Sequence, residues 1–273
     1  MIMKVQTAIK ILNKKLSTHC NNYNNECIFL CQELVGISRN DIVMNVDISD
    51  KDFKILNRAV NKRIKGVPLQ IIIGESDFLN IRVLENKYTL TPRPETEFLV
   101  DYIIKNESHD KKVLDLCCGS GCIGIALNKN GFENVVLSDV SKRALKFAVK
   151  NAKLNGVNVD VKRSNMFDSI SEKFDLIVSN PPYIETGDIK NLQTEVKRFD
   201  PKLALDGGSD GLDFYRIIGA NADKFLNDHG ILYLEIGLNQ EKQVQKLLEK
   251  NFKNITIIKD LNKINRFIRA EKC

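Results

Sequence analysis

The sequence has no apolar run long enough to cross a lipid bilayer, and its first residues lack the apolar segment followed by small residues that marks a secretory signal. A membrane-spanning protein and a signal-directed secreted protein are both disfavoured by these absences. We therefore expect a cytoplasmic protein without a membrane partner, and we also expect a monomer.

Histidine is scarce, with three residues in the chain, and the seven cysteines are an odd number. Cys117 and Cys118 are adjacent, and the chain is too long for a disulfide-stapled domain, so we expect reduced thiols. Cys27 and Cys31 have the i, i+4 spacing of helical metal ligands, but no second cysteine pair of this kind lies nearby. We interpret them as part of an apolar helix face and predict no metal site.

The composition is that of a globular protein: 273 residues, 43% hydrophobic and 28% charged. This length fits one large α/β unit with a smaller appendage. The net charge of +6 is concentrated in residues 1–66, where 11 basic residues face 6 acidic ones, which leaves 30 against 29 in the rest. A basic appendage indicates contact with an acidic protein surface or RNA, although a solvated helical face explains the charge equally well.

Apolar residues recur at helical spacing through the first part of the chain, for example at Val5, Ala8, Ile9 and Leu12. Residues 1–66 are therefore predicted to form a small helical bundle. Residues 67–92 change period, and Gln70–Ile73 and Ile81–Leu84 predict two strands of a β-hairpin linker.

From residue 93 the chain is predicted to form one domain that ends at residue 273. Pro94 and the acids around it mark a helix start, and strands then alternate with helices. The predicted fold is α/β and Rossmann-like, with a seven-stranded, mostly parallel sheet covered by helices on both faces. The expected strands are 113–116, 135–139, 159–162, 174–179, 231–236, 255–258 and 266–269; the expected helices are 122–128, 141–155, 212–226 and 239–251.

The most informative stretch is Asn180-Pro181-Pro182-Tyr183, which follows the apolar strand Phe174–Ser179. A residue before proline is pushed into the extended region, and neither proline has an N–H. The Asn180 side-chain oxygen and the Pro181 carbonyl are therefore acceptors with no neighbouring backbone donor, and Tyr183 adds an aromatic face. Two fixed acceptors beside a flat ring suit a planar group that carries an NH2, either a carboxamide or the exocyclic amine of a base.

An amide nitrogen is a poor nucleophile because its lone pair is delocalised. Holding both of its N–H bonds in acceptors raises the electron density on nitrogen and aims it at one partner. No side chain of the motif is an obvious general base. The motif therefore predicts transfer of an already activated group, such as a methyl group on a sulfonium.

A second motif, Asp115-Leu116-Cys117-Cys118-Gly119-Ser120-Gly121, turns from a predicted strand into a helix. Its glycines permit a close backbone approach to a ligand, and Asp139, at the end of the next strand, stands where an acid would receive ribose hydroxyls. Gly119, Gly121 and Gly124 also spell a dinucleotide-binding pattern. However, Asp115 would repel a pyrophosphate and attract the ammonium of a methionine group. We therefore favour an S-adenosylmethionine-dependent methyltransferase over an NAD-dependent oxidoreductase.

With these residues in place, the sequence resembles the peptide chain release factor N5-glutamine methyltransferases, which are class I S-adenosylmethionine-dependent enzymes. The resemblance runs from Gly66 to the C-terminus and includes Thr91–Glu97, the glycine turn, Asn180–Tyr183 and Leu205–Gly208. It implies methyl transfer to the side-chain nitrogen of the glutamine in the Gly-Gly-Gln loop of release factors, with S-adenosylhomocysteine as product. It also implies release factors as partners, docked by the helical bundle of residues 1–66, and no stable nucleic-acid partner.

The resemblance also implies roles for individual residues. Asn180, the Pro181 carbonyl and Tyr183 would be catalytic, with Pro182 and Arg93 joining them in substrate binding. The cofactor would be held by Asp115, Cys117, Cys118, Gly119, Ser120, Gly121, Asp139, Asn165, Met166 and Asn180. Asn165 and Met166 would flank the adenine, and Cys117 stands where the family commonly has glycine.

Two other functions stay open at this point. An adenine-N6 methyltransferase on DNA or RNA would use the same pair of acceptors, but it would need a sizeable target-reading domain, which the first 66 residues do not obviously supply. A non-enzymatic binding module is disfavoured because the cofactor and acceptor motifs are intact.

Overall fold

The computed structural model describes residues 2–273, which fold as two compact units. The first unit extends to Glu75 and also includes Thr194–Phe199, whereas the second comprises Ser76–Gln193 and Asp200–Cys273. The chain therefore returns to the first unit for one short helix in the middle of the second. Within residues 2–273, none of the helices combines the length and apolar character of a membrane span.

The first unit is mainly helical. Its helices pack through apolar faces such as that of Val5, Ala8 and Leu12, which are fully buried. Ser49 accepts a hydrogen bond from the Asp52 N–H and so caps the longest helix. The elements are β1 (Ile2–Lys4), α1 (Val5–Leu16), α2 (Tyr23–Val35), α3 (Arg39–Val43), β2 (Asp47–Ser49), α4 (Asp50–Ile64), α5 (Leu69–Ile73) and α9 (Thr194–Phe199).

A buried ion-pair network fastens α9 within this first unit. The Arg63 guanidinium donates to Glu26 at 2.7 Å and to Glu195 of α9 at 2.5 Å, and the Arg63 residue is only 7% exposed. A buried guanidinium is stable only when acceptors surround it, so this network requires both carboxylates. Sequence periodicity gives no sign of it, because Glu195 is 132 positions from Arg63.

The predicted hairpin exists, but one of its two strands was placed wrongly. Gln70–Ile73 lies in α5, a single helical turn that Gly74 ends with a left-handed φ of 96°. The partner of β4 (Ile81–Leu84) is the polar segment β3 (Glu75–Phe78). A short apolar run does not distinguish a strand from a helical turn, and the polar sequence of β3 gave no strand signal.

The second unit contains the predicted seven-stranded sheet, in the order β10-β11-β9-β8-β5-β6-β7. Four strand pairs in the middle and on one side of this sheet are parallel, and β11 is antiparallel to both of its neighbours. The strands are β5 (Val113–Leu116), β6 (Val135–Asp139), β7 (Asp160–Arg163), β8 (Phe174–Ser179), β9 (Leu226–Glu235), β10 (Phe252–Lys259) and β11 (Asn265–Lys272).

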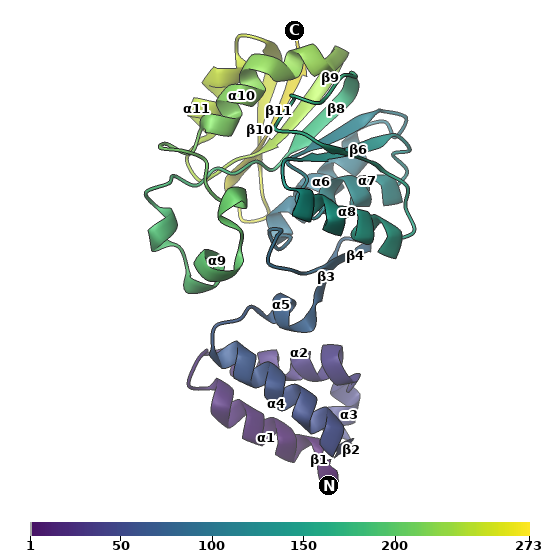
Figure 1. The fold of residues 1–273 in the computed structure, drawn as a ribbon, viewed down its shortest axis with the longest axis vertical. Helices are drawn as coiled ribbons and strands as arrows, with labels where there is room; N and C mark the ends of the chain where they lie inside the picture. Colours follow the sequence, from purple (N-terminus) through teal and green to yellow (C-terminus); the bar gives the residue numbers. More distant parts are fainter. Residues whose placement is uncertain (1) are drawn as a thin grey trace. The chain divides into compact units, whose positions relative to one another are not determined.

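Helices cover both faces of this sheet, as predicted (Figure 1). On one face lie α6 (Pro94–Asn106), α7 (Cys122–Lys129) and α8 (Lys142–Leu154), and on the other lie α10 (Asp213–Asn221) and α11 (Glu241–Leu248). Side chains of successive strand residues alternate between the two cores, so that Val113 faces the first and Leu114 the second. The predicted helix 212–226 is shorter in the structure, because η3 (Ala222–Phe225) follows α10 and β9 begins at Leu226.

Candidate active site

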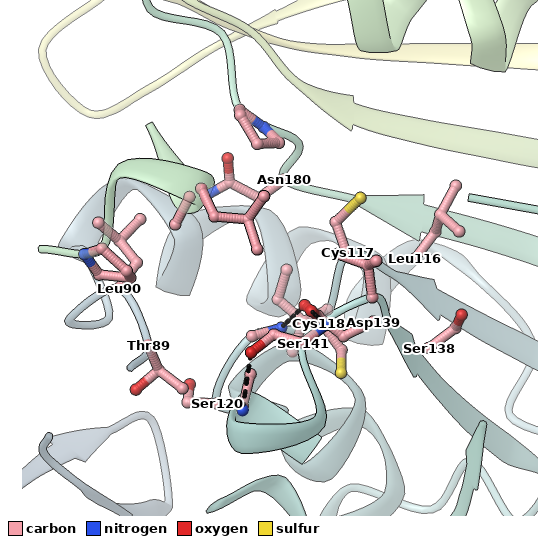
Figure 2. A pocket seen from close by; sticks show the side chains of 18 of the residues that line it. Thr89, Leu90, Leu116, Cys117, Cys118, Ser120, Ser138, Asp139, Ser141 and Asn180 are labelled. Atoms are coloured by element: carbon pink, nitrogen blue, oxygen red, sulfur yellow. Dashed lines mark hydrogen bonds between the residues drawn. The ribbon is translucent and has the colours of Figure 1, made fainter. Parts of the chain in front are cut away.

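A cavity of about 360 Å³ opens at the carboxyl ends of β5, β6 and β8. Because β6 and β8 flank β5 on opposite sides, this is the switch point at which ligands bind in open α/β sheets. Figure 2 shows Asn180 and Cys117 at the ends of neighbouring strands, with Thr89 and Leu90 across from them. The predicted site residues that line the cavity are Arg93, Cys117, Cys118, Gly119, Ser120, Asp139, Asn165, Met166, Asn180 and Pro182.

The glycine turn joins β5 to α7 as the sequence predicts. Gly121 has a φ of 79° and lies against β6, where a Cβ atom would approach Leu137 Cδ1 to 3.0 Å. Glycine is therefore required at this position both by the backbone conformation and by the close packing. The tight turn at Gly121 leaves the preceding residues, Cys117 to Ser120, at the cavity, where they form part of its wall.

Asp115 lies behind this turn and does not line the cavity. Asp115 is fully buried. Its Oδ2 accepts a hydrogen bond from the Gly124 N–H at 2.9 Å, whereas its Oδ1 has no hydrogen-bond partner among the described residues. Burial raises the pKa of the carboxyl to about 7. An unpartnered buried carboxylate oxygen beside a ligand cavity is compatible with a cationic ligand group, which would lower that pKa.

Asp139, at the end of β6, holds the turn together. Its Oδ2 accepts from the Gly119 N–H at 2.9 Å and its Oδ1 from the Ser141 N–H at 2.7 Å, as Figure 2 shows. Burial raises the pKa of this carboxyl, and the two N–H groups oppose that shift. Each oxygen keeps a second lone pair, so the side chain can still accept hydroxyl donors from the cavity.

Two non-glycine residues in the cavity wall have left-handed backbone conformations, Cys117 with a φ of 62° and Met166 with a φ of 48°. The Cys117 thiol donates to the Met166 sulfur at 3.7 Å. Strain of this kind clusters at functional sites because only the surrounding structure maintains it. Burial raises the pKa of the Cys117 thiol to about 12, so this sulfur stays protonated.

Asn180 follows β8 and is held by two further side chains, Thr96, which also lines the cavity, and Glu235, which lies behind it. Its Nδ2 donates to Thr96 Oγ1 at 3.3 Å, and the Thr96 hydroxyl donates to Glu235 Oε2 at 2.7 Å. Thr96 and Glu235 are both 3% exposed. With its nitrogen occupied in this way, the Asn180 amide oxygen is left as the acceptor available to a ligand.

Pro181 and Tyr183 do not line the cavity, in contrast to Pro182. The Tyr183 ring packs against the second core, where Gly237 leaves room for it, since a Cβ atom there would lie 3.1 Å from Tyr183 Cδ2. The Tyr183 carbonyl accepts from Gln240 Nε2 at 3.1 Å. The segment after Asn180 is therefore anchored at its far end.

Two arginines also line the cavity. Arg93 Nη2 donates to Asp200 at 2.8 Å, and the Arg143 guanidinium lies 4.9 Å from the centre of the Tyr88 ring. Arg93, Arg143 and Tyr88 all line the cavity. The predicted substrate residue Arg93 is therefore at the cavity, but its charge is already paired.

Sequence reasoning missed Thr96, Glu235 and the cation–π pair of Arg143 and Tyr88. Glu235 offered a usable signal, because it is a carboxylate near the end of a predicted buried strand. Thr96 stands in the proline-rich stretch Thr91–Glu97, but no neighbouring residue indicates that its hydroxyl donates to a residue 139 positions away.

Two family models match separate parts of the chain. Residues 94–199 match the model of the methyltransferase small domain, and residues 7–74 match that of the PrmC N-terminal domain. Among solved structures, a methyltransferase from Pyrococcus furiosus has a TM-score of 0.55 at 16% identity, covering 78% of this chain and 97% of that one. This likeness shows the class I methyltransferase fold.

Several curated relatives are close over most of their length. The release factor glutamine methyltransferase of Thermodesulfovibrio yellowstonii is 40% identical, with 84% of this chain and 85% of the relative aligned. The protein of the same name from Streptococcus pneumoniae is 41% identical over 88% of both chains. That from Bacillus cereus is 34% identical over 98% of this chain and 99% of the relative.

Proposed function

The chain belongs to the release factor glutamine methyltransferase family, and from that premise we propose how its residues methylate the side-chain nitrogen of the glutamine in the Gly-Gly-Gln loop of class I release factors. The enzyme is a methyltransferase that modifies release factor glutamine. The proposed methyl donor is S-adenosylmethionine, with S-adenosylhomocysteine as product. The proposed location is the cytoplasm, because release factors act on ribosomes.

One observation carries the proposal: the Asn180 amide is oriented by Thr96, so that its oxygen remains free at the cavity. A glutamine carboxamide brings two N–H donors. The Asn180 oxygen would accept one, and we assign the other to the Pro181 carbonyl, just outside the cavity lining, with Pro182 bounding the plane of the amide. Tyr183 packs against the second core and would hold this segment in place rather than contact the amide. Two hydrogen bonds to these acceptors would fix the orientation of the amide and direct the nitrogen lone pair toward one electrophile.

The residues around the glycine turn fit the proposed donor. Asp115, buried behind the turn, would attract an ammonium in the cavity through its charge, Asp139 has lone pairs for ribose hydroxyls, and Asn165 and Met166 would contact the base. When bound, the donor supplies a methyl group on a positively charged sulfur. Cys117, Cys118, Ser120 and Arg93 would contribute to the walls of the two binding sites.

The chain's own contribution to the reaction is orientation and exclusion of water. The reacting nitrogen starts neutral, and Glu235, the carboxylate joined to Asn180 through Thr96, already accepts a hydrogen bond, so we assign no general base. After the methyl transfer the nitrogen is positively charged and strongly acidic, so one of its protons would pass to solvent water. The acceptors at Asn180 and Pro181 would stabilise the positive charge that develops on that nitrogen.

Transfer of radiolabel tests this function directly. The protein is incubated with S-adenosylmethionine labelled in the methyl group and, in turn, with release factors, unmethylated DNA and RNA. We expect label on the release factor, and none on a release factor whose loop glutamine is replaced by alanine. Label on DNA or RNA without label on release factor would instead support adenine methylation, and label on no acceptor would contradict both.

A further inference from the structure

Glu235, Thr96 and Asn180 form one hydrogen-bonded series that starts in the core and ends at the cavity. Glu235 is the last residue of β9, Thr96 lies in the first turn of α6, and Asn180 follows β8. The Thr96 hydroxyl donates to Glu235 Oε2 at 2.7 Å and accepts from Asn180 Nδ2 at 3.3 Å. Three elements far apart in the sequence therefore converge on one amide group.

The direction of this series follows from counting protons. A hydroxyl has one proton to donate, and an ionised carboxylate can only accept. While Glu235 is ionised, Thr96 must donate to it, and Thr96 then has only lone pairs left for Asn180. The NH2 end of the Asn180 amide is thereby fixed toward Thr96, and its oxygen is turned away.

We propose that Glu235, acting through Thr96, selects which end of the Asn180 amide faces the substrate, so that the site accepts a carboxamide NH2 only while Glu235 is ionised. This inference rests on the proposed function. Glu235 and Thr96 are positioning residues, since both would act on the substrate amide through Asn180.

Protonation of Glu235 would reverse the direction of hydrogen-bond donation along Glu235, Thr96 and Asn180. A neutral carboxyl can donate to Thr96, and Thr96 can then donate to the Asn180 oxygen, which brings the Asn180 NH2 toward the cavity. Two NH2 groups would then face each other, and the substrate amide would lose its acceptor. Turnover should therefore fall as Glu235 becomes protonated.

The surroundings of Glu235 put this change near neutral pH. Burial raises the pKa of its carboxyl to about 7, and Glu95 adds to the rise, whereas Thr96, Arg266 and Asn180 oppose it. Tyr183 is a further titratable neighbour, and the Tyr215 hydroxyl donates to the Glu235 backbone carbonyl at 2.9 Å. Burial raises the pKa of both tyrosines well above neutral, so neither changes charge in this range.

The test measures kcat against pH at saturating methyl donor and release factor. Thr96→Val keeps the shape of the side chain but removes the hydroxyl, and we expect kcat to fall by about 10- to 100-fold. Thr96→Ser should restore kcat to within about threefold of the wild type, with the dissociation constant of the donor unchanged throughout. Wild-type kcat should decline below about pH 7, and both Glu235→Gln and Thr96→Val should lose that decline.

Glu107→Gln is the matched control. Glu107 is 8% exposed and accepts from the Tyr233 hydroxyl at 2.6 Å, but it does not line the cavity, so this variant should keep the wild-type decline. Asp115 also has a pKa of about 7, and its titration should change donor affinity rather than kcat at saturation. Thermal melting of each variant reports whether it is folded.

The outcomes separate the inference from the function it rests on. If the wild type puts no label on release factor, the proposed function fails. If the wild type is active but Thr96→Val has nearly wild-type kcat, or folded Glu235→Gln keeps the acid decline, the series does not control Asn180 and this inference is wrong.

Discussion

Asp115 shows how a single buried residue links stability to pH. Burial raises the pKa of its carboxyl from the ordinary 3.8 to about 7. Between about pH 4 and pH 7 the folded chain therefore holds a proton that the unfolded chain releases. The contribution of this group to stability is complete at low pH and is lost as the pH rises toward neutral.

We accordingly predict that the free energy of unfolding of the ligand-free protein falls from pH 5 to pH 7, by at most about 1.4 kcal/mol per pH unit for each such group. Asp115→Asn should make this fall smaller, because an amide does not titrate. Urea unfolding at a series of pH values measures both slopes.

Asp41→Asn is the control for this measurement. Asp41 is half-buried at the start of α3, and a hydrogen bond from Ser38 lowers the pKa of its carboxyl, so its titration lies below the pH range used. This variant should keep the wild-type slope. An unchanged slope in Asp115→Asn would show that the carboxyl is already ionised in the folded protein.

At the residue scale, the sequence predicted those cavity side chains whose residue type and position in a motif indicate their chemistry. Asn180 before two prolines, and Asp139 one strand after the glycine turn, both line the cavity. The sequence could not predict the support for Asn180, because Thr96 and Glu235 meet only through the packing of α6 on the sheet. It also did not show that Pro181 and Tyr183 lie outside the cavity lining.

At the scale of elements, residues 205–208 form a brace for the segment that follows Asn180. The Ile184 N–H donates to the Leu205 carbonyl at 2.9 Å, and the Gly207 N–H donates to the Ile184 carbonyl at 2.8 Å. Gly207 lies so close to the prolines that a Cβ atom would be 2.7 Å from Tyr183 Cα and 2.9 Å from the Pro182 carbonyl oxygen. The brace therefore fixes the position of Asn180–Tyr183, the segment that carries the proposed acceptors; we call this segment the acceptor corner.

Gly207→Ala should displace this corner because both neighbours are backbone and cannot rotate away. We expect kcat to fall by about tenfold or more, with a loss of stability of about 1–3 kcal/mol. Steady-state kinetics and urea unfolding measure the two effects.

Gly187→Ala provides the comparison, since nothing lies within 4 Å of a Cβ atom at that position. This variant should have wild-type kinetics and stability. Equal kcat in the two variants would mean that the brace does not position the site.

Helices and strands with a clear hydrophobic pattern were predictable from the sequence, whereas elements that depend on tertiary contacts were not. The strands 113–116, 135–139 and 174–179 were predicted with their observed bounds because apolar β-branched runs end at polar or proline-rich turns. The helical turn at Leu69–Ile73 was mistaken for a strand, and α9 was not predicted. The membership of α9 in the first unit depends on the buried Arg63 pair, which no local pattern reveals.

At the scale of the whole molecule, the excess of basic residues in the first 66 positions distinguishes the two units. We propose that this part of the chain docks the release factor. Lys10 and Lys14 are exposed and one helical turn apart on α1, so their charges are available to an acidic surface.

Reversing both charges, Lys10→Glu with Lys14→Glu, should raise the KM for release factor by about three- to tenfold at low salt and leave the affinity for the methyl donor unchanged. The matched pair on α11 is Lys242→Glu with Lys246→Glu, which has the same spacing and exposure in the second unit. An equal rise in KM for both pairs would indicate a general charge effect and contradict docking through the first unit.

The kinetics of Asn180→Ala test most directly whether the Asn180 amide orients the substrate. With saturating substrates, we expect kcat to fall by about 100-fold or more while the dissociation constant of the methyl donor stays within about threefold of the wild type. A variant that binds the donor normally and keeps near wild-type kcat would show that Asn180 does not have this role.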